Sequence, residues 1–343
     1  MKAVVKFAPI RCYVRHYEKD EAQLKIYRNV DYIENVPETA VALGNFDGVH
    51  LGHQRLINNM VESARNDKLK PAVFTFSNHP KDLLPGVKKV KNILYNERKV
   101  EIIASLGVEY LFEIPFTKEI MEMEAVDFIE EILLAKLNMK AAFCGFNYRF
   151  GARAAGNPDI LRNEGRKAAF NVYEIEPFFI EGNIVSSSLI RTLIASGQVE
   201  KCMTYLGRNY EIGGEVVVGN RLGRKLGFPT SNLVIDKTMV TPPNGVYITY
   251  CDYNGVRYPS VTNVGCKPTI GNFEKNVETH IFNFNKELYG KRIIVEFLKK
   301  TRDEVKFDST EELSEQIVRD CKEAMKFHEA RSAVKPMSIR RRE

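Results

Sequence analysis

The chain has 343 residues, of which 44% are hydrophobic and 27% are charged, and it carries a formal net charge of +6. This length and composition indicate a soluble globular protein with two domains, and the mild positive charge alone favours no class of partner. The six cysteines form no CxxC pair, the charged first thirty residues lack the apolar core of a signal peptide, and no apolar run approaches the roughly 18 residues of a membrane helix. We therefore expect a cytoplasmic protein with reduced thiols and no place in a membrane.

Short apolar runs alternate with longer amphipathic stretches in the first half of the chain. Strands are expected at residues 40–43, 72–76, 110–114, 141–144 and 171–175, and helices through residues 54–57, 97–106 and 125–137. Strand and helix in this alternation predict a parallel sheet with helices on both faces. Such sheets bind ligands beyond the carboxyl ends of their strands, where the topology reverses.

The pattern changes after about residue 207, where runs rich in Val, Ile, Tyr and Phe follow one another without helices between them. These runs lie at residues 210–218, 245–252, 257–264, 277–284 and 291–298, and a helical pattern follows at 310–326. Successive short strands separated by turn residues predict an antiparallel sheet or a small barrel, closed by a terminal helix.

The change of pattern divides the chain near residues 195–207. We expect an α/β domain at residues 26–197 and a β domain at residues 198–330. Residues 1–25 fit neither pattern and are left unassigned, and residues 331–343 read as a basic tail of a kind that is usually solvated.

A glycine-bearing turn follows the first expected strand and leads into a helix. His50 and His53 lie three residues apart at the start of that helix, so they face the same way. The backbone N–H groups of a helix N-terminus favour a phosphate, and protonated imidazoles could donate to oxygens that gain charge in a transition state. The glycines of the turn allow close approach of a ligand. The predicted phosphate site adds five turn residues to the histidines, namely Gly44, Asn45, Phe46, Asp47 and Gly48.

Two further segments of the α/β half offer groups for a phosphate. Ser186 and Ser187 form an N-cap signal, and Arg191, one turn into the expected helix, can reach a phosphate oxygen. Asn147 follows the fourth expected strand, at the sheet edge where a ligand crevice is expected.

The β half has its own set of candidate residues. Thr230 and Asn232 stand two apart in an extended segment, so their hard oxygens face one side and suit magnesium. Glu278 is a carboxylate within a β-rich run, where a base could take the proton of a hydroxyl that attacks a phosphate. The chain has neither a Walker loop nor a GxGxxG motif, but three glycines indicate a flexible phosphate-covering loop, namely Gly219, Gly223 and Gly227.

These motifs resemble those of the bacterial bifunctional riboflavin kinase/FMN adenylyltransferase family, also called FAD synthetase. The N-terminal motifs are GNFDGVHLGHQ at 44–54, TFSNHP at 75–80, GFNYRFG at 145–151 and VSSSLIR at 185–191. The C-terminal motifs are GEVVVG at 214–219, GRKLGFPTSN at 223–232, NVG at 263–265 and VETHI at 277–281. The resemblance covers roughly residues 40 to 325.

The resemblance implies a Rossmann-like HxGH nucleotidyltransferase domain followed by an antiparallel β-barrel kinase domain with a terminal helix. It implies that ATP phosphorylates riboflavin to FMN and then adenylylates FMN to FAD, with release of pyrophosphate. ATP, riboflavin and FMN would be the substrates, magnesium the cofactor, and flavin-requiring apoproteins candidate recipients.

Residue roles follow from the same resemblance. It places His50, His53, Asn147 and Arg191 on the triphosphate. In the kinase domain it makes Glu278 the base, gives magnesium and ATP to Thr230 and Asn232, and places Arg302 on the flavin phosphate.

The sequence departs from the family pattern at four positions. Ser77 and Asn78 stand where the family has Asp and Pro, which puts a local flavin or phosphate contact in doubt but not the reaction. Ser188 replaces Thr and keeps a hydroxyl, and Ser231 replaces Ala at a position that faces away from its neighbours Thr230 and Asn232.

Three alternatives stay open at this stage. The chain could be another HxGH nucleotidyltransferase, with an unrelated β domain or with only one of the two activities retained, but the motif series at 214–232 argues against this. It could be a flavin-binding or regulatory protein with inactive sites, but the complete set of candidate residues argues against that. It could bind nucleic acid, since HxGH also occurs in aminoacyl-tRNA synthetases and the tail ends in Arg340-Arg341-Arg342, but no aromatic residues are interleaved with these arginines.

Overall fold

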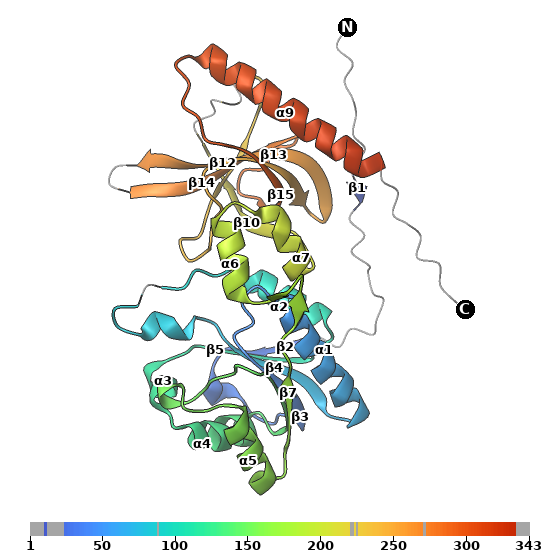
Figure 1. Cartoon of the computed structure of the whole chain (residues 1–343), viewed down its shortest axis with the longest axis vertical. Helices are drawn as coiled ribbons and strands as arrows, with labels where there is room; N and C mark the ends of the chain where they lie inside the picture. Colours follow the sequence, from blue (N-terminus) through green and yellow to red (C-terminus); the bar gives the residue numbers. More distant parts are fainter. Residues whose placement is uncertain are drawn as a thin grey trace, which may run out of the picture.

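The computed structural model describes residues 10–11, 24–87, 89–219, 223, 226–269 and 272–333. An α/β domain and a barrel domain stack along the long axis of the molecule, and helices α6 (Ser187–Ala195) and α7 (Cys202–Leu206) lie between them (Figure 1). No helix of these residues is long and apolar enough to cross a membrane. The cysteines within the described part are free thiols.

The α/β domain is built on a six-stranded parallel sheet, as the alternating pattern predicted. Its strand order is β2-β5-β4-β3-β6-β7. The strands are β2 (Lys25–Tyr27), β3 (Thr39–Leu43), β4 (Lys70–Phe76), β5 (Tyr110–Ile114), β6 (Met139–Gly145) and β7 (Asn171–Ile175). The five expected strands are confirmed. β2 was not expected, because three residues at a sheet edge give no periodic signal.

Helices cover both faces of this sheet because side chains alternate along each strand. Ala40 and Ala42 face α1 (Leu51–Asn66) and α2 (Asn96–Ser105), whereas Val41 and Leu43 belong to the core on the other face. That second face packs against α5 (Pro158–Ala168) and against one long helix at residues 125–136, which is α-helical in α4 (Ala125–Asp127) and π-helical in η3 (Phe128–Lys136). Shorter elements of the domain are η1 (Val30–Tyr32), η2 (Pro80–Leu83), α3 (Lys118–Glu122), η4 (Ala152–Ala154) and the hairpin β8 (Phe179–Ile180)–β9 (Asn183–Ile184).

The second domain is a closed antiparallel barrel, as expected. Its strand order is β13-β12-β15-β10-β11-β14, and pairing of β13 with β14 closes it. The strands are β10 (Tyr210–Val217), β11 (Ser231–Val234), β12 (Gly245–Tyr253), β13 (Val256–Thr269), β14 (Asn272–Ile281) and β15 (Arg292–Asp303). In addition, β1 (Ile10–Arg11) of the unassigned N-terminal region pairs antiparallel with β13.

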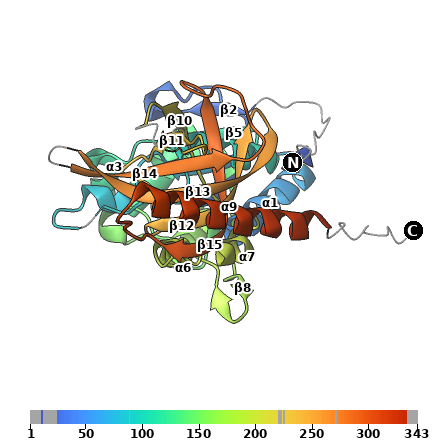
Figure 2. The ribbon, with the colours of Figure 1, turned by 90° about the horizontal axis from the view of Figure 1, so that it is seen from above.

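The terminal helix α9 (Thr310–Ala333) lies across the barrel (Figure 2). Its Cys321 and Ala324 pack against Val246, Ile248 and Val261 of the barrel wall. The helix runs through Ala333, so residues 331–333 of the expected tail are helical, and residues 334–343 lie outside the described part.

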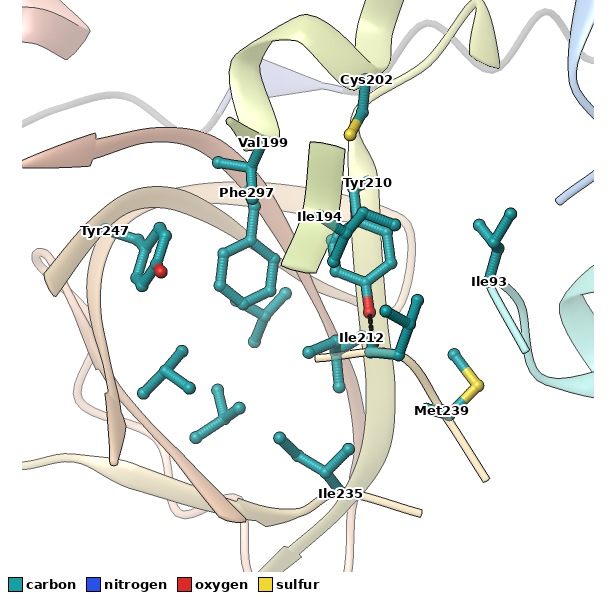
Figure 3. Packing of buried hydrophobic residues seen from close by; sticks show 14 of the residues in the cluster. Ile93, Ile194, Val199, Cys202, Tyr210, Ile212, Ile235, Met239, Tyr247 and Phe297 are labelled. Carbon is teal, nitrogen blue, oxygen red and sulfur yellow. Dashed lines mark hydrogen bonds between the residues drawn. The ribbon is translucent and has the colours of Figure 1, made fainter. Parts of the chain in front are cut away.

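One hydrophobic cluster joins the two domains. Ile93 and Ile194 of the α/β side pack with Tyr210, Tyr247 and Phe297 of the barrel (Figure 3). Backbone bonds cross the same junction, because Asn92 donates to the Thr238 carbonyl at 2.7 Å and accepts from the Val240 N–H at 2.9 Å. The two domains therefore share one apolar cluster and are also joined by backbone hydrogen bonds.

Candidate active sites

The first candidate site lies where the parallel sheet reverses its order. β3 is the first strand of the βα series and has β4 on one side and β6 on the other. The glycine-bearing turn leaves the carboxyl end of β3, and the exposed Asn147 follows β6. The structure thus brings the turn and Asn147 to the topological switch point, where ligands of such folds bind.

His50 and His53 stack against each other at the start of α1. Their ring centroids are 3.6 Å apart, and His50 caps the helix by accepting the His53 N–H on Nδ1 at 3.2 Å. Burial, and next the nearby charge of Arg208, lower the pKa of His50 to about 4. Burial also lowers the pKa of His53, whose Nδ1 is enclosed without a hydrogen-bond partner in the described part of the chain.

These pKa directions describe the ligand-free site, and protonation of the imidazoles beside a bound polyphosphate stays a prediction. With both pKa values lowered, the ligand-free pair is neutral at pH 7 and can donate only through one N–H of each ring. The positive charge at this site is supplied instead by arginines and by the helix N-terminus.

Asp47 connects the turn to the other predicted residues. Its carboxylate pairs with Arg191 Nη2 at 2.6 Å and accepts the Ile93 N–H at 2.8 Å, and its carbonyl accepts from Ser187 Oγ at 2.9 Å. Ser186 caps α6 by accepting the Leu189 N–H at 3.3 Å. Arg191 and Ser187 are therefore brought to the turn, but both are engaged with Asp47.

Phe46 has a supporting position rather than a ligand-facing one. Its side chain is fully buried, and its ring meets that of His53 edge-on at 5.2 Å between centroids. A Cβ on Gly44 would lie 3.1 Å from the Phe46 ring, so the glycine lets the ring fold back under the turn. Gly48 has φ +79°, a conformation that glycine adopts without strain.

The second candidate site consists of two cavities in the barrel domain that share Thr230. A cavity of about 390 Å³ is lined by Gly219, Thr230 and Asn232 and by the loop at residues 284–289. A cavity of about 270 Å³ lies between the barrel and α9 and is lined by Thr230 and Glu278 among others. Thr230 thus forms part of the wall between them.

Strand register brings Asn232 and Glu278 together. The two residues are direct partners in the pairing of β11 with β14, and Asn263 of β13 faces Glu278 from the other side. The Asn276 amide donates to Glu278 Oε1 at 2.9 Å and to Asn232 Oδ1 at 3.2 Å. The side-chain oxygens of two predicted residues therefore meet at one amide beside the shared wall.

The three loop glycines are divided between the cavities. Gly219 lines the larger cavity, where a Cβ would overlap the Asn232 amide, and Gly223 lines the smaller one. Gly227 has φ +87°. The rest of the predicted phosphate-covering loop, residues 220–222 and 224–225, lies outside the described residues.

Arg302 lines the smaller cavity but is bonded to α9. Its Nε and Nη2 donate to the two carboxylate oxygens of Asp320 at 2.9 and 2.7 Å. Gln316 donates to the same carboxylate at 2.8 Å. A contact of Arg302 with a flavin phosphate stays a prediction, and it would have to compete with this bidentate pair.

His280 and Asn78 have contacts near the two sites that the sequence alone did not predict. His280 lies two residues beyond Glu278 on β14 and lines the same cavity, and its Nδ1 lies 2.8 Å from the Pro229 carbonyl just before Thr230. The two-residue spacing from Glu278 was the available signal.

Asn78 donates to the Phe116 carbonyl at 3.1 Å and accepts the Phe116 N–H at 2.7 Å. At a position where the family has proline, the Asn78 side chain therefore holds the segment that follows β5.

Comparison with known proteins assigns a family model to each domain. The family model for FAD synthetase matches residues 33–189, and the one for riboflavin kinase matches residues 206–328. A bifunctional riboflavin kinase/FMN adenylyltransferase of Bacillus subtilis is 35% identical over 86% of this chain and 94% of its own length. The Buchnera aphidicola (Schizaphis graminum) protein of that name is 33% identical over 89% and 99%.

This chain belongs to the bifunctional riboflavin kinase/FMN adenylyltransferase family. The presence of both domains supports a bifunctional enzyme of flavin cofactor synthesis and not the alternative with a single activity. A solved structure from Streptococcus pneumoniae, titled a macrolide-efflux protein, is 31% identical with a TM-score of 0.79, over 87% of this chain and 97% of that one. The fold is therefore shared over nearly the whole length of both chains.

Proposed function

We propose that the turn after β3 and the start of α6 form the adenylylation site of this enzyme. His50 and His53 would donate to the ATP phosphates, with Gly44, Asn45 and Gly48 allowing the nucleotide close to the backbone. Arg191 would turn from Asp47 to a phosphate, and Asn147 would approach from β6. The FMN phosphate then attacks the α-phosphorus and pyrophosphate leaves, so positioning and charge neutralisation carry the catalysis.

In the barrel domain we propose that the two cavities hold the two substrates of riboflavin phosphorylation. The larger one, beside Gly219 and Asn232, would take ATP, and the smaller one, under α9, would take the flavin. Glu278 would accept the proton of the ribityl hydroxyl as it attacks the γ-phosphorus. The position of Thr230 in both cavities supports this assignment, since the transferred group has to pass between them.

The residues beside the larger cavity fit magnesium. Asn232 Oδ1 and the Thr230 hydroxyl are hard neutral oxygens, and Asn232 is 5% exposed. The described residues contain no group of three or more His, Cys, Asp or Glu side chains that could hold a metal. The ion would therefore depend on these two oxygens together with phosphates and water, which is usual for Mg²⁺, and it would neutralise phosphate charge.

The observation that carries the proposal is that each set of motif residues gathers in its own domain. We expect the enzyme to act in the cytoplasm on small molecules, with no nucleic acid as partner. The test is to incubate the protein with ATP, magnesium and either riboflavin or FMN, and to separate the flavins. FMN and FAD from riboflavin, and FAD from FMN, are the expected products. Conversion of neither flavin would overturn the proposal.

A further inference from the structure

Four carbonyl groups of the turn after β3 are held by side chains from other elements. The Asn45 carbonyl accepts from Thr75 Oγ1 at 3.0 Å, and the Asp47 carbonyl accepts from Ser187 Oγ. The Gly48 carbonyl accepts from Arg208 Nη2 at 2.6 Å, and the Val49 carbonyl accepts from Arg208 Nη1 at 3.2 Å. A single guanidinium therefore holds the two peptide groups that immediately precede His50.

The turn needs such support because its backbone is strained. Phe46 has φ 48° and Val49 has φ 36°, and a β-branched residue rarely adopts a positive φ. Strained backbone of this kind persists only where its surroundings fix it. A planar trans peptide also fixes the N–H opposite its carbonyl, so Arg208 aims the Val49 and His50 N–H groups away from itself.

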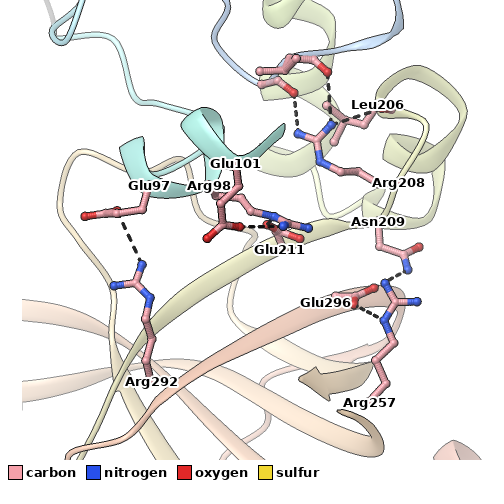
Figure 4. A network of polar contacts seen from close by, with 12 residues as sticks. Glu97, Arg98, Glu101, Leu206, Arg208, Asn209, Glu211, Arg257, Arg292 and Glu296 are labelled. Atoms are coloured by element: carbon pink, nitrogen blue, oxygen red, sulfur yellow. Dashed lines mark hydrogen bonds and ion pairs between the residues drawn. The ribbon is translucent and has the colours of Figure 1, made fainter. Parts of the chain in front are cut away.

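Arg208 comes from the other side of the domain junction. It lies 160 residues from Gly48, in the segment that the riboflavin kinase family model matches, two residues before β10. The same guanidinium donates to the Leu206 carbonyl at 3.3 Å (Figure 4). Gln54 of α1 also donates to the Val49 and Leu206 carbonyls, at 2.8 and 3.0 Å. The start of α1 and the end of α7 are thus joined through shared carbonyl acceptors.

Resting on the proposed adenylylation at this turn, we propose that Arg208 is a positioning residue of that reaction, supplied to the nucleotide site by the kinase-matched half of the chain. It bonds the backbone before His50 and reaches none of the groups assigned to the kinase cavities. Its role is to hold the turn in the conformation that places His50 and His53 against the phosphates. A displacement of about 1 Å in such groups can cost about 100-fold in rate.

The charge of Arg208 adds a second, separable effect. The charged groups that act on the pKa of His50 are Arg208 and Arg191 of α6, and the titratable His53 of α1 stacks on its ring. Burial lowers the pKa of Arg208 to about 10, so it stays protonated at neutral pH and helps to keep the pKa of His50 low. Removing this charge raises the pKa of His50.

The test compares Arg208→Gln and Arg208→Lys in the full-length enzyme. Arg208→Gln should lower kcat for FAD formation from FMN by about 10- to 100-fold, with a smaller change in KM, and should leave riboflavin phosphorylation unchanged. Protonation of His50 Nδ1 removes the acceptor that caps α1 through the His53 N–H, so the acid limb of the rate profile should move to higher pH in this variant. Arg208→Lys keeps the charge but cannot bridge two carbonyls, so its rate should fall while its acid limb stays at the wild-type position.

Arg98→Gln is the matched control. Arg98 crosses the same junction to Glu211 at 2.7 Å but bonds no atom of the turn. The inference is overturned if Arg208→Gln keeps adenylylation within threefold of wild type, or if Arg98→Gln lowers it equally. If Arg208→Gln shows no cooperative thermal transition, Arg208→Lys decides by the same rates. Wild-type protein that forms no FAD from FMN would instead refute the adenylylation proposal.

Discussion

The turn of the α/β domain that carries His50 is held by side chains from β4, α6 and the domain junction, whereas Asn232 and Glu278 lie on paired strands of one barrel. In the barrel, backbone pairing itself sets the distance between these residues. In the turn, the conformation is strained and depends on hydrogen bonds from distant segments. The geometry of the site on the strands is therefore set by local backbone pairing. The geometry of the site on the turn depends on hydrogen bonds from distant segments.

The largest effect should come from breaking the strand-built site alone. Glu278→Gln keeps the shape but cannot accept a proton, so riboflavin phosphorylation should fall by about 10²- to 10⁴-fold. FAD formation from supplied FMN should stay unchanged, because that site lies in the other domain. The measurement is turnover at saturating riboflavin and ATP. A loss of less than about threefold would make Glu278 an orienting residue, which a loose phosphoryl-transfer transition state permits.

His53→Ala is the mirror experiment in the loop-built site. It removes a phosphate donor and the ring that stacks on His50, so FAD formation from FMN should fall by at least about 10²- to 10³-fold. FMN formation from riboflavin should persist. His280→Ala, in the barrel, serves as the histidine control and should leave the adenylylation rate alone. Normal FAD output from His53→Ala would remove the histidine assignment.

Arg302→Ala should weaken the attachment of α9 to the barrel and leave the turn after β3 unchanged. Its pair with Asp320 is bidentate and partly buried, so the loss should cost about 1.5–3 kcal/mol in unfolding free energy and raise the KM for riboflavin. Arg319→Ala removes an exposed pair with Glu315 at 3.6 Å on the same helix and should be near neutral. Denaturant unfolding and flavin titrations measure both. If affinity for FMN falls far more than affinity for riboflavin, Arg302 acts on the phosphate instead.

The smallest expected effect is on the pH dependence of the unfolding free energy, through a histidine of α9 that packs on the barrel. His328 is fully buried against Tyr250, and burial lowers its pKa below 6.5. Because the unfolded chain then binds the proton more readily, this stabilising effect is present above pH 6.5 and is lost as pH falls through the folded-state pKa. Wild type should lose more unfolding free energy between pH 7.5 and 5 than His328→Gln. Parallel losses in the two proteins would show that His328 does not titrate on unfolding.

The sequence alone predicted the sheet and the barrel, which the structure confirms, and the roles of the two residue sets stay predictions. Buried strands such as β3 and β6 read as apolar runs, and the motifs are contiguous in the chain. β2 and β11 were not predicted as strands, because three and four residues are too few to show a hydrophobic period. Thr230 and Asn232 were nevertheless expected in an extended segment, and both line the larger barrel cavity.

The missing parts are those that depend on contacts between distant residues. Arg208 reads as an ordinary polar residue after a helix, and only the fold brings it to a turn 160 residues away. The neutral state of the two histidines likewise depends on burial, which the motif does not encode. Asn78 was marked as a departure, but its two bonds to Phe116 could not be foreseen from the missing proline.

Because both domains contribute to the apolar cluster at the junction, a loss of stability there would lower both activities in a cell. Because Ile194 and Phe297 belong to one core, a cavity there would weaken both domains at once, at a cost of about 2–5 kcal/mol for a buried Ile reduced to Ala. Losses of that size raise the fraction of chains that proteases remove, so the amounts of FMN and FAD synthesised would decline together. Mutations in this shared core would therefore lower both activities together, even though the two reactions occupy separate sites.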